Sequence, residues 1–247
     1  MGVETGDTGD APAGRRLRAN RGLQVAEILA PFAVVMGTVV VFRPLVAESA
    51  LAAQGVVWMG NVLMLTAIGL TLRVRGEGVD ALGLTPRFQG VRSAIRTVGQ
   101  SVLVFLAAAG CFVFGTIVMA NVTGLPAGAD TTELSFMAGN LPMLLFALAG
   151  SYLVSSFGEE FVYRGFLIRR VGALLGDGRL ARWTAVAVSA LVFGAAHYSW
   201  GITGVVQTTF MGLALGCSYQ LLRRRLWPLV LAHGYMDTIL MLQIYLS

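Results

Sequence analysis

Six ionisable side chains lie within apolar stretches of this 247-residue chain: Glu159, Glu160, Arg164, His197, His233 and Asp237. Glu160 and Arg164 are four residues apart, as are His233 and Asp237, so each pair shares one face of a helix. Glu159 points about 100° away from Glu160 on a helix and has no such local partner. An ionised group at the centre of a bilayer costs about 2.5–3.5 kcal/mol, so these residues are candidates for a functional site.

Carboxylates and imidazoles gathered in a confined apolar site are suited to the activation of a water molecule. A carboxylate can act as general base, and a neutral histidine can orient the water or donate to a developing oxyanion. The same set contains candidate zinc ligands, Glu159, His197 and His233, because two histidines and a carboxylate leave a fourth position for water. The spacing of the residues leaves both mechanisms open.

Most of these residues also have a structural interpretation. A single histidine inside a membrane commonly forms an interhelical hydrogen bond. Glu160 and Arg164 by themselves are typical of a structural ion pair. Glu159 has no comparable partner in the sequence, so the prediction of chemistry depends on the joint pattern.

The rest of the sequence predicts a membrane protein. Hydrophobic residues make up 56% of the chain before its 31 glycines are counted, 13% are charged, and the mean hydropathy is +0.73. A soluble domain is about 25% charged. One span needs about 20 apolar residues, so the length allows six to eight. We expect an all-α, polytopic transmembrane helical bundle of about seven spans, near residues 23–42, 50–72, 98–120, 140–175, 183–197, 202–222 and 227–246.

The polar termini and loops complete the predicted organisation. Residues 1–20 are expected to be a disordered cytoplasmic tail, and residues 21–247 a single transmembrane domain. Cys111 and Cys217 lie in apolar runs, which predicts buried thiols and no disulfide framework. Gly212 and Gly216 form a GxxxG pattern that predicts close helix packing.

The distribution of basic residues predicts an orientation. All 18 are arginines, and 17 of them fall in segments 1–22, 73–96, 164–182 and 223–226. With a cytoplasmic N-terminus, seven spans put all four segments on the cytoplasmic side, as the positive-inside rule requires. The net charge of +5 therefore needs no nucleic acid to explain it.

Three motifs in order, Glu159-Glu160-x-x-x-Arg164, Phe193-x-x-x-His197 and His233-x-x-x-Asp237, resemble the CAAX-protease and bacteriocin-processing family over residues 139–240. These intramembrane peptidases, also called the Abi family, are related to the Ras-converting CAAX prenyl endopeptidase. The resemblance implies that Glu159 activates water with help from His197, and that Glu160 and Arg164 support the geometry.

The resemblance also implies that His233 and the residue at position 237 stabilise the oxyanion or hold the site. Many relatives carry asparagine where this chain has Asp237, so Asp237 must be protonated, pair with His233 or bind a metal. The family's mechanism has been described both as metal-dependent and as glutamate–histidine activation of water, so zinc remains a possible cofactor.

We therefore expect an intramembrane endopeptidase of a bacterial cell membrane that acts on a membrane-associated or peptide substrate. The alternative is a non-catalytic membrane scaffold or bacteriocin-immunity protein with the same fold. A transporter that uses Glu159 and Asp237 as proton carriers is a third hypothesis, which the absence of an internal repeat in the sequence disfavours.

Overall fold

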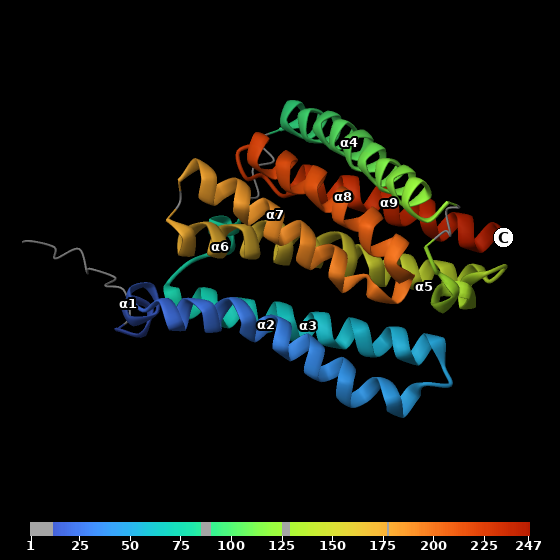
Figure 1. Cartoon of the computed structure of the whole chain (residues 1–247), viewed down its shortest axis with the longest axis horizontal. Coiled ribbons are helices and arrows are strands. Elements are labelled where there is room, and N and C mark those ends of the chain that lie inside the picture. The colour runs from blue at the N-terminus through green and yellow to red at the C-terminus, as the bar shows by residue number, and fades with distance from the viewer. Residues whose placement is uncertain (1–11, 85–89, 125–128, 177) are drawn as a thin grey trace, which may run out of the picture.

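The computed structural model describes residues 12–84, 90–124, 129–176 and 178–247, and the regular structure within them is helical (Figure 1). The longer helices are α1 (Pro12–Ala19), α2 (Arg21–Phe42), α3 (Ala50–Arg75), α4 (Val91–Thr123), α5 (Leu141–Ser151), η4 (Tyr152–Leu167), α6 (Ile168–Leu175), α7 (Arg179–Ala196), α8 (Gly201–Leu221) and α9 (Trp227–Leu246). Four short 3₁₀ turns are η1 (Arg43–Val46), η2 (Val79–Leu82), η3 (Thr132–Met137) and η5 (Tyr198–Trp200).

Six helical segments of the described chain are long and apolar enough to cross a membrane: 21–46, 50–75, 91–123, 141–175, 179–196 and 227–246. Helix α8, which we expected as a further span, packs along α4 and α7 within the same bundle. The predicted all-α bundle of six to eight spans is confirmed. The predicted fourth span also continues without a break to residue 175, as α5, η4 and α6.

Capping side chains begin three of the spans. Asn20 accepts a hydrogen bond from the backbone N–H of Leu23 at the start of α2. Ser49 caps α3 and Asn140 caps α5 in the same way. These side chains satisfy backbone donors that a helix leaves unpaired at its first turn.

The helices form two groups that meet along the middle of the bundle (Figure 1). Helices α2 and α3 pack as an antiparallel pair, and α4, α8 and α9 pack together on the other side of η4 and α7. The close approach of α7 and α8 depends on glycine: a Cβ at Gly216 would lie 2.8 Å from Val186 Cγ1, and one at Gly212 would lie 3.2 Å from Ala190 Cα. The close packing predicted for this GxxxG pattern is confirmed.

The expectation of a disordered tail over residues 1–20 is wrong for its second half. Residues 1–11 lie outside the described residues, but α1 is helical and docks on the end of α3. Arg18 donates to the backbone oxygen of Arg75 over 3.0 Å. Gly14 lies so close that a Cβ would be 2.6 Å from Val74 O. Tertiary contacts therefore order a polar segment whose composition alone predicted disorder.

The arginine-rich segments meet at one end of the bundle. Glu27, which is 5% exposed, accepts two hydrogen bonds from Arg75 and faces Arg170 Nε at 3.0 Å. Arg170 also donates to Glu77 over 2.9 Å. Two segments that the positive-inside rule placed on one side, 73–96 and 164–182, are thus joined to each other and to α2 by buried ion pairs. The cytoplasmic location of this end stays a prediction.

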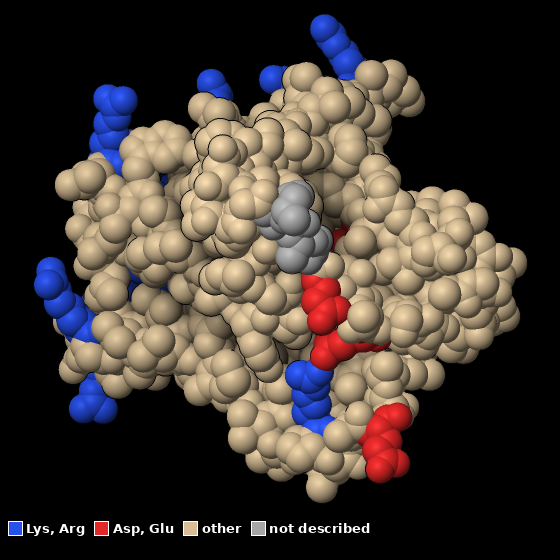
Figure 2. Space-filling model, turned by 45° about the vertical axis from the view of Figure 1, so that its right-hand side comes forward, with Lys and Arg blue, Asp and Glu red and all other residues tan. Residues whose placement is uncertain are grey.

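The other end of the bundle carries few arginines. Arg43, the one arginine predicted to lie on the opposite side, forms an ion pair with Glu133 in η3. Figure 2 shows acidic side chains beside one basic side chain, while the remaining basic side chains project at the edges of the view. The two ends of the bundle therefore differ in charge as the sequence predicted.

Candidate active site

The site is built on η4, which is wound as a π-helix. Its hydrogen bonds join residues five apart, as in the bond from the N–H of Ile168 to Tyr163 O. Residues with a spacing of five therefore come onto one face. Ser151 and Ser156 have this spacing, and both donate to Asp237 Oδ2 on α9, over 2.8 and 2.7 Å.

Glu160 and Arg164 form the ion pair that their spacing predicted. Arg164 Nη1 donates to Glu160 Oε1 over 2.8 Å, and the side chains are 1% and 0% exposed. The guanidinium carbon of Arg164 also lies 4.3 Å from the ring centroid of Phe193, in cation–π contact. This pair lies in the protein interior, out of contact with solvent.

His233 connects the ion pair to the other two carboxylates. Its Nδ1 lies 2.8 Å from Glu160 Oε1, and its Nε2 lies 3.8 Å from Glu159 Oε2 and 3.7 Å from Asp237 Oδ1. An ionised carboxylate only accepts hydrogen bonds, so Nδ1 donates to Glu160. That bond turns Nε2 toward the space between Glu159 and Asp237.

Glu159 and Glu160 are adjacent in sequence but have different surroundings. The side chain of Glu160 is 0% exposed, whereas the side chain of Glu159 is 18% exposed. Glu159 Oε2 is buried beside His233 with no hydrogen-bond partner among the described residues. Its distance of 3.8 Å from Nε2 exceeds that of a direct hydrogen bond but suits one bridged by water. Glu160 Oε2 also has no hydrogen-bond partner among the described residues, but its side chain is fully buried, so Glu159 is the partly accessible carboxylate with a free acceptor oxygen.

Asp237 resembles Glu159 in exposure but not in bonding. Its side chain is 14% exposed, and its Oδ2 accepts from Ser151 and Ser156. Its Oδ1 faces His233, so of the three roles considered for Asp237 the pairing with His233 is the one that the geometry supports. The two hydroxyl donors supply hydrogen bonds that a buried carboxylate needs.

His197 lies beside this cluster, at the end of α7. Its Nδ1 lies 2.8 Å from Phe193 O, and a carbonyl oxygen only accepts, so Nδ1 donates and Nε2 is left as acceptor. The ring packs against Phe193 and Trp200, with centroid distances of 4.8 and 5.0 Å. Among the described residues no hydrogen bond or ion pair joins His197 to Glu159. Instead the Phe193 ring, whose centroid is 6.1 Å from that of His233, is in contact with both imidazoles.

The predicted zinc ligands are not arranged as a metal site. Within the described parts of the chain, no three His, Cys, Asp or Glu side chains are grouped so that they could hold a metal ion. Glu159, His197 and His233 therefore do not fit a zinc ion as they stand, and no step of the chemistry below is assigned to one.

The structure adds two site residues that the sequence motifs did not identify, Ser151 and Ser156. The signal is present in the sequence as two serines five apart in an apolar helix, ahead of the Glu159-Glu160 motif. An α-helix would place residues five apart on different faces, so the signal has meaning only once π winding is known.

A match to a protein family covers the part of the chain that holds this site. Residues 141–239 match the family described as type II CAAX prenyl endopeptidase Rce1-like. The matched range covers all six predicted site residues as well as both serines. No curated protein and no solved structure matches the chain. The resemblance inferred from the three motifs is confirmed by this match, and the chain is a multi-pass membrane protein whose residues 141–239 are similar to the Rce1-like family.

Proposed function

We propose that the protein is an intramembrane endopeptidase that hydrolyses a peptide bond with water activated by Glu159. The observation that carries the proposal is the arrangement around His233 Nε2, which faces Glu159 and Asp237 while Nδ1 is held by Glu160. A partly accessible carboxylate beside an oriented imidazole is the pair that general base catalysis requires. The Rce1-like match supports peptide hydrolysis as the reaction class.

The reaction proceeds in two steps. Glu159 takes a proton from water while the water oxygen bonds to the carbonyl carbon of the substrate. The same proton then passes to the leaving nitrogen as the carbon–nitrogen bond breaks. Glu159 returns to its starting state, so a single carboxylate serves as base and then as acid.

His233 provides the electrostatic part of this mechanism. With Nδ1 donating to Glu160, Nε2 carries a proton only in the imidazolium form of His233, and in that form it points into the space between Glu159 and Asp237, where it can donate to the oxyanion. The buried Glu160–Arg164 pair fixes the ring, and Asp237 is fixed by Ser151 and Ser156. A donor held in place before the reaction stabilises developing charge without reorganisation.

The test is a comparison of cells that express the wild-type protein or Glu159→Gln. Mass spectrometry of peptide termini in the membrane fraction identifies cleavage products whichever protein is the substrate. We expect a set of new termini that is present with wild type and lost with Glu159→Gln, because the amide cannot accept a proton from water. Glu48→Gln, at an exposed position between α2 and α3, is the matched control and should behave as wild type.

Purified variants in liposomes then test the candidate peptides directly. The expected loss on Glu159→Gln is about 10²–10⁴-fold in rate, the range that general acid–base groups contribute. Cleavage that survives Glu159→Gln would refute the mechanism. A protective phenotype that survives both Glu159→Gln and His197→Ala would identify a scaffold or immunity protein instead.

A further inference from the structure

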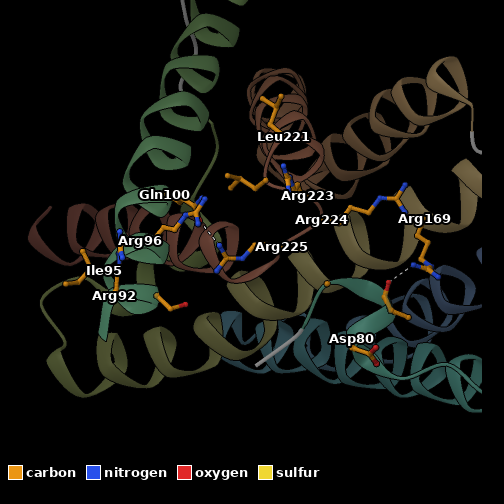
Figure 3. A pocket seen from close by; sticks show the side chains of 14 residues that line it. Asp80, Arg92, Ile95, Arg96, Gln100, Arg169, Leu221, Arg223, Arg224 and Arg225 are labelled. Carbon is orange, nitrogen blue, oxygen red and sulfur yellow. Dashed lines mark hydrogen bonds between the residues drawn. The ribbon is translucent and has the colours of Figure 1, made fainter. Parts of the chain in front are cut away.

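A second cavity, distinct from the site around His233, lies at the arginine-rich end of the bundle and has a volume of about 1270 Å³. Six arginines line it: Arg92, Arg96, Arg169, Arg223, Arg224 and Arg225. They come from α4, from α6 and from the turn between α8 and α9, and they surround one space (Figure 3). Asp80 is the one carboxylate among the lining residues. None of the six predicted site residues lines this cavity.

The charge of these arginines is not neutralised within the described structure. Arg225 donates to the neutral acceptors Gln100 and Thr97, over 3.1 and 3.0 Å, and Arg169 donates to Ala81 O over 2.7 Å. Among the described residues, no carboxylate lies within ion-pair distance of any of the six. The six are exposed or half-buried, whereas the buried arginines Arg164, Arg75 and Arg170 each face a carboxylate. The cavity therefore concentrates positive charge that lacks a counter-ion.

Two of the arginines occupy backbone conformations that favour glycine or asparagine. Arg223 and Arg224 have φ values of 54° and 61°, and they are the non-glycine residues with positive φ in the described chain. The left-handed region costs an ordinary residue about 1–2 kcal/mol. The turn is held in place, because Arg224 N–H donates to Tyr219 O over 2.8 Å and Gly83 packs against Arg224 O. Long cationic side chains at strained positions indicate that the side chains themselves are used.

Apolar side chains border the same cavity. Ile95 on α4 and Leu221 at the end of α8 line it and are 67% and 74% exposed. A site with guanidinium groups on one part and exposed apolar groups on another matches a molecule with both an anionic and an apolar portion. A free anion has no apolar portion and would make no apolar contact with Ile95 or Leu221.

We propose that this cavity binds the phosphate group of an anionic phospholipid, with Ile95 and Leu221 beside its acyl chains. Guanidinium groups bind phosphate oxygens through paired, charge-assisted hydrogen bonds. Basic pockets between transmembrane helices on the cytoplasmic side are sites of this kind. The positive-inside rule accounts for arginines at this end of the bundle, but not for their convergence from three elements on one cavity.

The test measures binding to the purified full-length protein in a neutral detergent by calorimetry. The probes are short-chain phosphatidylglycerol, short-chain phosphatidylcholine and inorganic phosphate. We expect phosphatidylglycerol to bind more tightly than either of the other two. Arg92→Gln/Arg96→Gln should weaken its binding roughly thirtyfold, since a basic residue near anionic lipid contributes about a factor of five.

Two further variants separate this site from general charge. Arg179→Gln/Arg182→Gln removes the same charge from exposed positions at the start of α7 that do not line the cavity, so affinity should change less than about threefold. Arg223→Asn/Arg224→Asn removes two cavity charges while asparagine tolerates the left-handed turn. It should lose lipid affinity without loss of thermal stability.

Three results would overturn the proposal. The cavity variants could bind phosphatidylglycerol as tightly as wild type does. The α7 control could lose as much affinity as the cavity variants, which would indicate attraction by overall charge. Inorganic phosphate could bind as tightly as phosphatidylglycerol, which would assign the cavity to a soluble anion.

Discussion

Variants of the buried ion pair between Glu160 and Arg164 test whether these two side chains stabilise the site as one structural unit. Arg164→Met removes the cation and leaves Glu160 charged at a position that is 0% exposed. Glu160→Gln keeps the shape and an acceptor oxygen but leaves the Arg164 charge buried without its partner. The double variant Glu160→Gln/Arg164→Met leaves neither charge. These three variants form a double-mutant cycle on one contact of 2.8 Å.

The structure sets the expected free energies of unfolding. Removal of one partner of a buried ion pair costs about 3–5 kcal/mol, mainly because the remaining charge is uncompensated. The double variant avoids that penalty, but it loses the cation–π contact with Phe193, which is worth about 0.5–2 kcal/mol. We therefore expect the double variant to be more stable than either single variant, with a coupling of at least about 2 kcal/mol.

The measurement is equilibrium unfolding in mixed detergent micelles, with Glu48→Gln as an exposed control that should leave stability unchanged. Circular dichroism and tryptophan fluorescence should give the same transition, which checks that a free energy can be defined. If the double variant lost the sum of the two single losses within about 0.5 kcal/mol, the two side chains would be acting independently. The interpretation of Glu160 and Arg164 as one structural unit would then be wrong.

Three further changes test other parts of the bundle by the same unfolding measurement. Ser156→Ala removes a donor to the carboxylate of Asp237 and should cost about 1.5–3 kcal/mol, as for hydrogen bonds to charged groups; no loss would show that the other hydroxyl suffices. Gly194→Ala places a Cβ 2.8 Å from a backbone oxygen of α8 and should lower the free energy of unfolding by about 1–3 kcal/mol. Its control is Gly110→Ala, where a Cβ meets nothing within 4 Å, and this variant should be as stable as wild type or more stable. Glu27→Gln leaves two buried arginines without their shared carboxylate and should cost about 3–5 kcal/mol, and a loss under 1 kcal/mol would contradict the buried network.

The fold and the ion pairs were predictable because they depend on local, periodic features of the sequence. Apolar runs of membrane-spanning length gave the helices, and α9 runs from Trp227 to Leu246 as predicted. The four-residue spacing of Glu160 and Arg164 predicted the ion pair that the structure contains. The gathering of most arginines at one end was predictable from their positions in alternate loops, where the positive-inside rule places basic residues.

The serine donors and the position of His197 were not predictable in this way. Both depend on tertiary geometry: π winding brings Ser151 and Ser156 onto the face toward Asp237, and the packing at the end of α7 decides what His197 contacts. Nothing in the composition of residues 152–167 distinguishes a π-helix from an α-helix. The order of residues 12–19 was missed for a similar reason, since a polar segment is ordered here by contacts with α3.

The two imidazoles are brought together from helices that begin at the same end of the bundle. His233 follows Trp227 by six residues, or about 9 Å along α9, while His197 follows the whole of α7, or about 27 Å. Parallel helices would leave the rings far apart, yet both contact the Phe193 ring, so their centroids are at most about 11 Å apart. Helix α7 is therefore inclined relative to α9 or begins farther out along the bundle than α9 does. Three extended residues of a peptide cover about 10 Å, so under the proposed function a substrate in extended conformation would be long enough to contact both imidazoles.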